Sequence, residues 1–343
     1  MDDLILLDGS AGEGGGQILR TALSLSLLTG RAFRIDAIRA KRPKPGLRPQ
    51  HMQVALAAAR LGGEVSGATV GSSTLTFRPK PYAPDDLAID IGTAGASSLV
   101  LQTLHLPMAM RATAPIRVTV EGGTFNEGAP SFPYLLETWR PLMAALGLPI
   151  ALSMPSAGFY PAGGGRLEAW IEPSRPSPLS LLQRGPLRSI RGAAGVSGLP
   201  PEIARRLADR AARRLSGRGY DAEIAVLGWP GPSPGAALSL SAEFAHAPAT
   251  FLGLGARGKP AEAVADEAVD QLLAHLDGDG ALDPYAADQV LLPLAMAEGP
   301  SAYTVDQATE HLRTNARTVA AFLGRPIRVA EAGPGRAARV EID

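Results

Sequence analysis

The sequence contains no cysteine among its 343 residues. This absence excludes a disulfide framework, a thiol nucleophile and a thiolate metal site. An excess of one charge is also lacking, because Lys plus Arg and Asp plus Glu both number 33 and the formal net charge is zero. The overall charge therefore gives no reason to expect a polyanionic partner, and any such reason must come from a local segment.

Long apolar runs and targeting signals are missing as well. No apolar segment approaches the ~20 residues needed to cross a bilayer, and the start, MDDLILLDGSAGEGGG, lacks the basic and apolar regions of a signal peptide. Hydrophobic residues nevertheless make up 45% of the chain, which is typical of a folded globular protein. We expect a soluble cytoplasmic protein with a large core and no membrane partner. The sequence does not indicate its oligomeric state.

Helical and strand-like patterns alternate along the chain. The segments GEGGGQILRTALSLSLLTG and GTAGASSLVLQTLHLPMAM each lead from glycines into an apolar helix and then a strand, which indicates a repeated α+β unit. A proline- and serine-rich stretch, EPSRPSPLSLLQRGPL, is typical of a crossing between domains. We predict an α+β fold with three repeats over residues 1–183 and 279–343 and a smaller inserted α+β domain over 184–278. The main helices are expected near 16–29, 50–62, 95–110, 131–147, 200–217, 261–276, 286–297 and 309–323.

The segment TEHLRTNA places a histidine at the start of the last predicted helix. The apolar stripe of this helix excludes His311 and consists of Leu312, Ala316, Val319 and Leu323. With Thr309 as the N-cap, His311 lies among unpaired backbone N–H groups at the positive end of the helix dipole. Such a place favours neutral imidazole and attracts phosphate.

Two segments near the N-terminus offer groups that could bind an anion. GSAGEGGGQILR has no Walker or dinucleotide spacing, but its glycines let backbone N–H groups approach an anion and its Glu13 could bind a divalent cation. A plain tight turn is an equally open interpretation. The next segment carries seven positive charges and one negative charge, +6 over residues 31–48. It is either a solvated basic loop or a phosphate-binding fork that includes Arg39 and Arg42.

Polar residues also fall at the starts of other predicted helices. Gln50 and His51 follow the basic segment directly, and Gln102 lies one to two turns into the helix that GTAGASSLVLQ begins. None of these positions is diagnostic by itself.

The helix before His311 opens with Tyr285, Asp288 and Gln289. A tyrosine can stack on a base and an aspartate can orient an imidazole, although a capped surface turn would look the same. An acid in a glycine loop, an arginine pair and a helix-start histidine are together typical of phosphoryl or nucleotidyl transfer. In such chemistry an imidazole attacks phosphorus and later leaves, so that one hard step becomes two easier ones.

Six motifs, taken together, resemble those of the RNA 3′-terminal phosphate cyclases. They occur in order over residues 8–318, outside the proposed insertion: GEGGGQILR, IRAKRPKPGLRPQH, DIGTAGASSLVLQ, GFYPAGGGR, DQVLLPLAMAEGPS and HLRTNA. The resemblance implies three repeated βαβαββ-type units, like the C-terminal domain of translation initiation factor three, with a small inserted domain. It also implies a ligase-class enzyme that uses ATP to convert an RNA 3′-phosphate into a 2′,3′-cyclic phosphate.

The resemblance also implies roles for individual residues. His311 would attack the α-phosphorus of ATP and hold AMP covalently before passing it to the RNA end, which gives an RNA(3′)pp(5′)A intermediate. Mg²⁺ or Mn²⁺ would offset charge at phosphorus. The other implied roles are a metal carboxylate at Glu13, phosphate contacts at Arg20, Arg39, Arg42, Gln50 and His51, and a nucleotide pocket at Gln102, Tyr285, Asp288 and Gln289.

Two alternatives share the repeat fold. One is a non-catalytic cyclase-like scaffold in ribosome assembly, but such relatives lack the nucleophilic histidine that this sequence has. The other is an enolpyruvyl transferase, which would need neither ATP nor a nucleotidylated histidine. At Phe125 and Pro133 the sequence departs from the cyclase pattern, so contacts from the loop 122–134 are not carried over.

Overall fold

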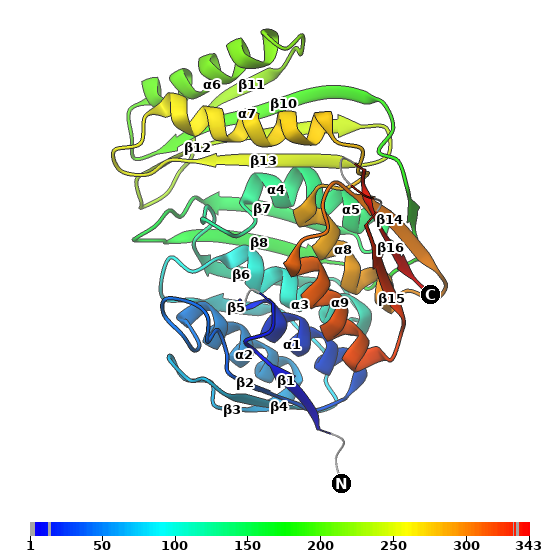
Figure 1. The fold of residues 1–343 in the computed structure, drawn as a ribbon. Coiled ribbons are helices and arrows are strands. Elements are labelled where there is room, and N and C mark those ends of the chain that lie inside the picture. Colours follow the sequence, from blue (N-terminus) through cyan, green and yellow to red (C-terminus); the bar gives the residue numbers. More distant parts are fainter. Residues whose placement is uncertain (1–3, 13–14, 332, 334–335) are drawn as a thin grey trace.

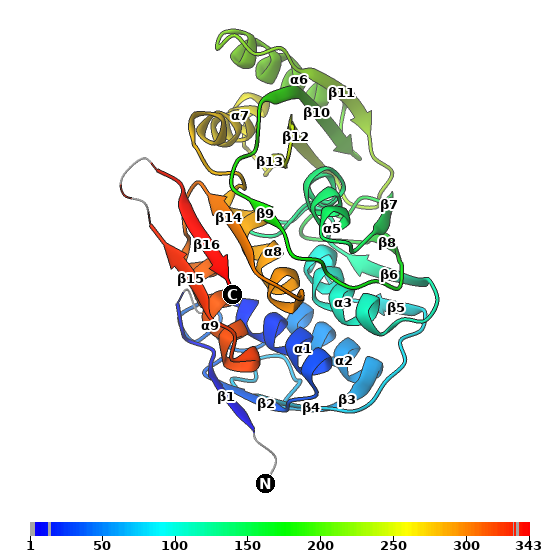
Figure 2. The same cartoon turned by 90° about the vertical axis from the view of Figure 1, so that its right-hand side faces the viewer.

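The structure is a computed structural model that describes residues 4–12, 15–331, 333 and 336–343. It is a mixed α+β protein, as the sequence predicts, with four four-stranded sheets among the described residues. Figure 2 shows helices α1, α3, α8 and α9 at the centre of the larger part of the molecule, with three of the sheets around them. The fourth sheet and its two helices lie to one side, at the top of Figure 1.

The first sheet has the strand order β1-β2-β4-β3. Strands β1 and β2 are parallel, and the other neighbours are antiparallel. Its elements in chain order are β1 (Ile5–Asp8), α1 (Gln17–Thr29), β2 (Phe33–Asp36), α2 (Pro49–Gly62), β3 (Gly63–Ser66) and β4 (Leu75–Pro79).

The second sheet has the order β5-β6-β8-β7, again with one parallel pair followed by antiparallel pairs. Its elements are β5 (Leu87–Asp90), α3 (Ser97–Arg111), β6 (Ile116–Gly122), α4 (Phe132–Tyr134), the π-helical turn η1 (Leu135–Trp139), α5 (Arg140–Ala145), β7 (Ile150–Ser156) and β8 (Gly165–Ile171).

The third sheet, β9-β14-β16-β15, repeats this pattern of one parallel and two antiparallel pairings. It combines one strand from the middle of the chain with the C-terminal elements. These are β9 (Ser180–Leu181), α8 (Pro284–Met296), β14 (Ser301–Val305), α9 (Glu310–Leu323), β15 (Ile327–Ala330) and β16 (Ala338–Ile342).

The fourth sheet, β11-β10-β12-β13, lies between β9 and α8 in the chain and has a hydrophobic cluster separate from that of the other three sheets. Leu207 of α6 and Leu272 of α7 are fully buried against its strands. Its elements are β10 (Leu187–Ser197), α6 (Pro201–Ser216), β11 (Glu223–Gly228), β12 (Gly235–Phe244), β13 (Pro248–Leu254) and α7 (Ala261–Asp277).

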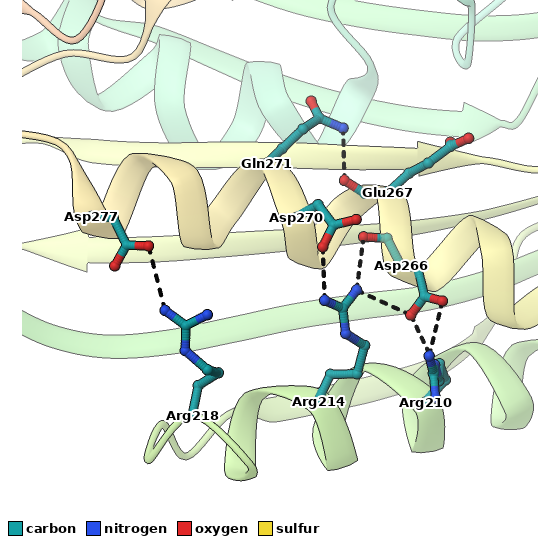
Figure 3. A network of polar contacts seen from close by, with 8 residues as sticks. All are labelled: Arg210, Arg214, Arg218, Asp266, Glu267, Asp270, Gln271 and Asp277. Carbon is teal, nitrogen blue, oxygen red and sulfur yellow. Dashed lines mark hydrogen bonds and ion pairs between the residues drawn. The ribbon is translucent and has the colours of Figure 1, made fainter. Parts of the chain in front are cut away.

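Arginines on α6 face carboxylates on α7, as Figure 3 shows. Asp266 accepts hydrogen bonds from Arg210, at 2.8 and 3.0 Å, and from Arg214, at 3.1 Å. Arg214 also donates to Asp270, at 2.7 Å. The arginine-rich character of α6 is thus largely balanced by the neighbouring helix, and it does not by itself indicate a nucleic-acid surface.

The predicted helices are present, with boundaries close to those expected, except that 131–147 is divided by the π-helical turn. Strands β1, β3, β5, β9, β13 and β14 were not predicted. Strand β3 has only four residues, none of them buried, so its hydrophobic alternation is too weak to indicate a strand. Within the described part of the chain, no helix is long and apolar enough to span a membrane.

Helix α1 is central to the larger part because it packs against α2, α3 and α9, while α8 packs against α9. Leu19 and Leu23 of α1 are buried in this core. The packing brings the N-terminal turns of α1, α8 and α9 together, although Gln17 of α1 lies 271 residues from Asp288 of α8 and 294 residues from His311 of α9 in the sequence.

Candidate functional site

His311 lies in the first turn of α9, as predicted. Thr309 is the N-cap, and its side-chain oxygen accepts a hydrogen bond from the backbone N–H of Leu312 at 3.2 Å, which confirms the predicted cap. Leu312 and Val319 of the apolar stripe are fully buried, whereas the His311 side chain is only half-buried. The helix is therefore anchored by its apolar face while its first turn presents the imidazole.

A glutamine that the sequence analysis did not single out holds this imidazole. Gln17, in the first turn of α1, has its Oε1 2.8 Å from His311 Nδ1. The Nε2 of Gln17 donates to one carboxylate oxygen of Asp288. The sequence offers one feature that could have singled out Gln17, because it is a polar residue within the motif GEGGGQILR at the start of a mostly apolar helix.

Asp288 is the centre of a buried amide network. Asn315 Nδ2 donates to its second oxygen at 2.8 Å, and Thr21 donates to Asn315 Oδ1 at 2.7 Å. Burial raises the pKa of Asp288, against the opposing effects of His311, Asn315, Arg20 and Gln17. Because both carboxylate oxygens accept from amides, the arrangement suits the ionised carboxylate.

A second group of predicted residues meets at Gly16. A Cβ added to this glycine would lie 2.1 Å from His51 Nε2 and 2.9 Å from Arg20 Nη1, so a side chain has no room here. Burial and the nearby arginines lower the pKa of His51 to about 3, and burial lowers that of Arg20 to about 10. His51 is thus neutral at physiological pH, with its Nδ1 accepting from the N–H of Arg48 at 3.1 Å.

Gly15 brings Arg42 close to the histidine. A Cβ on this glycine would lie 3.3 Å from Arg42 Nη2 and 3.8 Å from His311 Cε1. The guanidinium and the imidazole therefore border the same small space beside the glycine loop.

Arg39 and Gln50 have additional structural contacts. Arg39 has a left-handed backbone, with φ of 54°, and its Nη1 donates to the carbonyl oxygens of Lys44, at 2.7 Å, and Gly46, at 3.0 Å. It thus stabilises its own loop, which follows β2. Gln50 Oε1 accepts from the N–H of Ala96 at 3.0 Å and ties α2 to the start of α3.

A large cleft of about 1570 Å³ lies between the helices around His311 and the fourth sheet. Gln102 Nε2 donates to Gln289 Oε1 at 2.7 Å in its wall, and Tyr285 is 59% exposed. Six predicted site residues line the cleft, and they are Arg20, Gln102, Tyr285, Asp288, Gln289 and His311. The other four described ones, Arg39, Arg42, Gln50 and His51, are outside its lining.

The predicted metal carboxylate, Glu13, lies outside the described residues. Among the residues that the structure describes, no three histidine, aspartate or glutamate side chains form a group that could hold a metal ion. The role of Glu13 therefore stays a prediction.

The α+β fold and a histidine in the wall of a large cleft define the class of protein to which the comparisons can be applied. The family model described as RNA 3′-terminal phosphate cyclase matches residues 11–329. The chain therefore belongs to the RNA 3′-terminal phosphate cyclase family, as the sequence motifs indicate.

Curated relatives agree with this assignment along the whole chain. A protein named RNA 3′-terminal phosphate cyclase from Ralstonia nicotianae is 43% identical, with 99% of this chain and 97% of the relative covered. Proteins of the same name from Pseudomonas fluorescens and Methylococcus capsulatus are 44% and 42% identical, each covering 97% of this chain and 95% of the relative. The name describes an ATP-dependent enzyme of the ligase class, so this chain is a member of an enzyme family.

Proposed function

We propose that this protein converts the 3′-terminal phosphate of an RNA into a 2′,3′-cyclic phosphate at the expense of ATP, through a covalent histidine–AMP intermediate. Family membership supports the overall reaction. The observation that supports the intermediate is the orientation of His311 by Gln17 and Asp288.

The hydrogen bonds support Nε2 as the reacting nitrogen of His311. The carboxylate of Asp288 can only accept, so the Gln17 amide turns its NH₂ group toward Asp288 and its oxygen toward His311. The imidazole must then donate from Nδ1, and Nε2 keeps its lone pair. In the first step this Nε2 attacks the α-phosphorus of ATP, a P–N bond forms, and the bond to pyrophosphate breaks.

Two further transfers complete the reaction. An oxygen of the RNA 3′-phosphate attacks the histidine-bound AMP, the P–N bond breaks, and RNA(3′)pp(5′)A forms. The neighbouring 2′-hydroxyl then attacks the RNA phosphorus, the P–O bond to AMP breaks, and the proton of the hydroxyl passes to solvent, which leaves AMP and the cyclic phosphate. Arg20 and Arg42, beside the glycine loop, stabilise the negative charge of the phosphates in these steps. The half-exposed Tyr285 stacks on adenine, within a pocket that includes Gln102 and Gln289.

A divalent cation, Mg²⁺ or Mn²⁺, would offset charge on the ATP phosphates. Its proposed carboxylate ligand is Glu13, which lies outside the described residues, so no step of the mechanism is routed through the metal.

The two alternatives make different demands on the chain. A scaffold needs no positioned nucleophile, yet His311 is held in a defined orientation by Gln17. An enolpyruvyl transferase needs no ATP, and the family model and the relatives named above are cyclases.

We also propose that residues 1–183 and 279–343 form one domain of three βαβαββ-type repeats, and that 184–278 form an inserted domain. The same strand order and pairing pattern in three sheets supports the first part. The separate hydrophobic cluster of the fourth sheet supports the second. The cytoplasmic location expected from the sequence stays a prediction.

The covalent mechanism is tested with α-labelled ATP in the absence of RNA. Wild-type protein should retain label in denaturing gels, and His311→Ala should retain none and should not cyclise an RNA 3′-phosphate. His246→Ala, at an exposed histidine in the turn between β12 and β13, is the matched control and should label normally. A folded His311→Ala protein that still cyclises RNA would rule the mechanism out.

A further inference from the structure

The cleft exposes a second tyrosine, for which the proposed function has no role. Tyr160 is 82% exposed and lines the same cleft as His311 and Tyr285. It lies between β7 and β8, within the motif GFYPAGGGR. Tyrosine offers a rigid flat ring with only two side-chain torsions, and such rings are well suited to stacking against a ligand.

The loop that carries Tyr160 is braced by stacked aromatic rings. The neighbouring Phe159 is buried and stacks on Phe125, with ring centroids 4.7 Å apart and planes 3° apart. Trp229, from the segment between β11 and β12, packs on Phe125 at 4.6 Å. Phe125 thus has a packing role at a position where the sequence departs from the family pattern.

Hydrogen bonds fix the backbone of the same loop. Ser233 Oγ accepts from the N–H of Phe159 at 2.7 Å and donates to the carbonyl of Gly163 at 2.9 Å. Thr124 Oγ1 accepts from the N–H of Gly158 at 2.9 Å. The base of the Tyr160 side chain is therefore held in place before any ligand arrives, which lowers the entropy cost of binding.

On the side of the cleft formed by the fourth sheet and its helices, two of the cationic side chains form ion pairs within the protein. Arg206 is paired with Glu262 at 2.8 Å, and Lys259 is paired with Glu267. This part of the cleft is therefore better suited to the flat faces of bases than to a row of phosphates.

We propose that Tyr160 is a stacking platform for a base of the RNA substrate close to its 3′ end. This inference rests on the proposed function, in which the enzyme must hold two nucleotides at once, the adenylate and the RNA end. Tyr285 serves the adenylate, and Tyr160, fixed on a separate element of the same cleft, serves the RNA. Stacking is tolerant of base identity because every base has a π face.

The experiment compares Tyr160→Ala, Tyr160→Phe and a control, Trp170→Ala, at an exposed aromatic of β8 that does not line the cleft. Affinity for a fluorescent RNA with a 3′-phosphate is measured by anisotropy without ATP, and adduct formation is measured with labelled ATP without RNA. Tyr160→Ala should weaken RNA binding by roughly 5- to 150-fold. Tyr160→Phe and Trp170→Ala should bind nearly as well as wild type, and all three should form the adduct normally.

RNAs with a single abasic residue at each of the last few positions identify the base. At one position, removing the base should weaken wild-type binding and abolish the difference between wild type and Tyr160→Ala. Equal binding by wild type and Tyr160→Ala, a defect confined to adduct formation, or a defect unchanged at every abasic position would overturn the proposal. Loss of the wild-type adduct with an intact RNA effect would instead contradict only the histidine chemistry.

Discussion

At the scale of single residues, the reactive group is selected by a neighbour that itself does no chemistry. Gln17 lies between the carboxylate of Asp288, which can only accept hydrogen bonds, and the imidazole of His311, which must therefore donate one to Gln17. This makes Gln17 a positioning residue, with a role distinct from that of His311. Its effect should appear in the rate of adduct formation and not in ATP affinity.

Gln17→Ala should slow adduct formation by roughly 10- to 100-fold, by analogy with the loss found when the partner that orients a metal-binding histidine is removed. The KM for ATP should change little, because the amide is proposed to touch the histidine and not the nucleotide. Single-turnover rates over a range of ATP concentrations separate the two parameters. Gln183→Ala, at an exposed glutamine outside the lining of the cleft, is the control, and an unchanged rate in Gln17→Ala would remove Gln17 from the mechanism.

At the scale of elements, a row of ion pairs joins α6 to α7, and Figure 3 shows part of it. A single exposed ion pair contributes little to the stability of the folded protein. Asp266, however, pairs with two arginines and lies at the centre of the row. The row keeps the arginines of α6 directed at α7.

Asp266→Asn should lower the melting temperature by about one to three degrees at low ionic strength. The difference should shrink in ~1 M NaCl, because salt screens charges over a few ångströms. Asp277→Asn, at the end of the row with a 3.4 Å contact to Arg218, should have a smaller effect. Calorimetry at both salt concentrations tests this, and a penalty for Asp266→Asn that is independent of salt would contradict an electrostatic cause.

At the scale of the whole molecule, burial of histidines makes stability depend on pH. His51 has its pKa lowered from 6.5 to about 3. Below pH 6.5 His51 therefore binds a proton in the unfolded chain but stays neutral in the folded protein. The contribution of neutral His51 to the free energy of unfolding is fully present above pH 6.5 and is lost as the pH falls toward 3.

His51→Gln should remove this loss. Relative to its value at pH 8, the difference in unfolding free energy between variant and wild type should shift in favour of the variant by up to about 1.4 kcal/mol for each pH unit below 6.5. His105 is also buried with a pKa of about 3, but it is present in both proteins and cancels. Urea unfolding between pH 8 and pH 5 gives the slopes, and parallel slopes would show that His51 is protonated in the folded state.

Much of the fold and the site could be predicted from local sequence. Helix α9 and its N-cap followed from an apolar stripe with period 3.6 and a threonine before it, because both are set within one or two turns of chain. The motifs around Arg42 and His311 indicated the family, which the comparisons confirm. Strands of four residues, such as β3, could not be predicted because their pairing depends on partners elsewhere in the chain.

The sequence by itself determined the helices, the family and the candidate nucleophile, since these depend on residue types at short, fixed spacings. Tertiary structure alone decided that Gln17, Asp288 and His311 form one chain of hydrogen bonds, because they come from the starts of α1, α8 and α9. It also decided that Tyr160 lies on a loop that contacts Trp229 and Ser233, from the segment between β11 and β12. Contacts between residues tens or hundreds of positions apart depend on how helices and sheets pack, and no local spacing in the sequence records that packing.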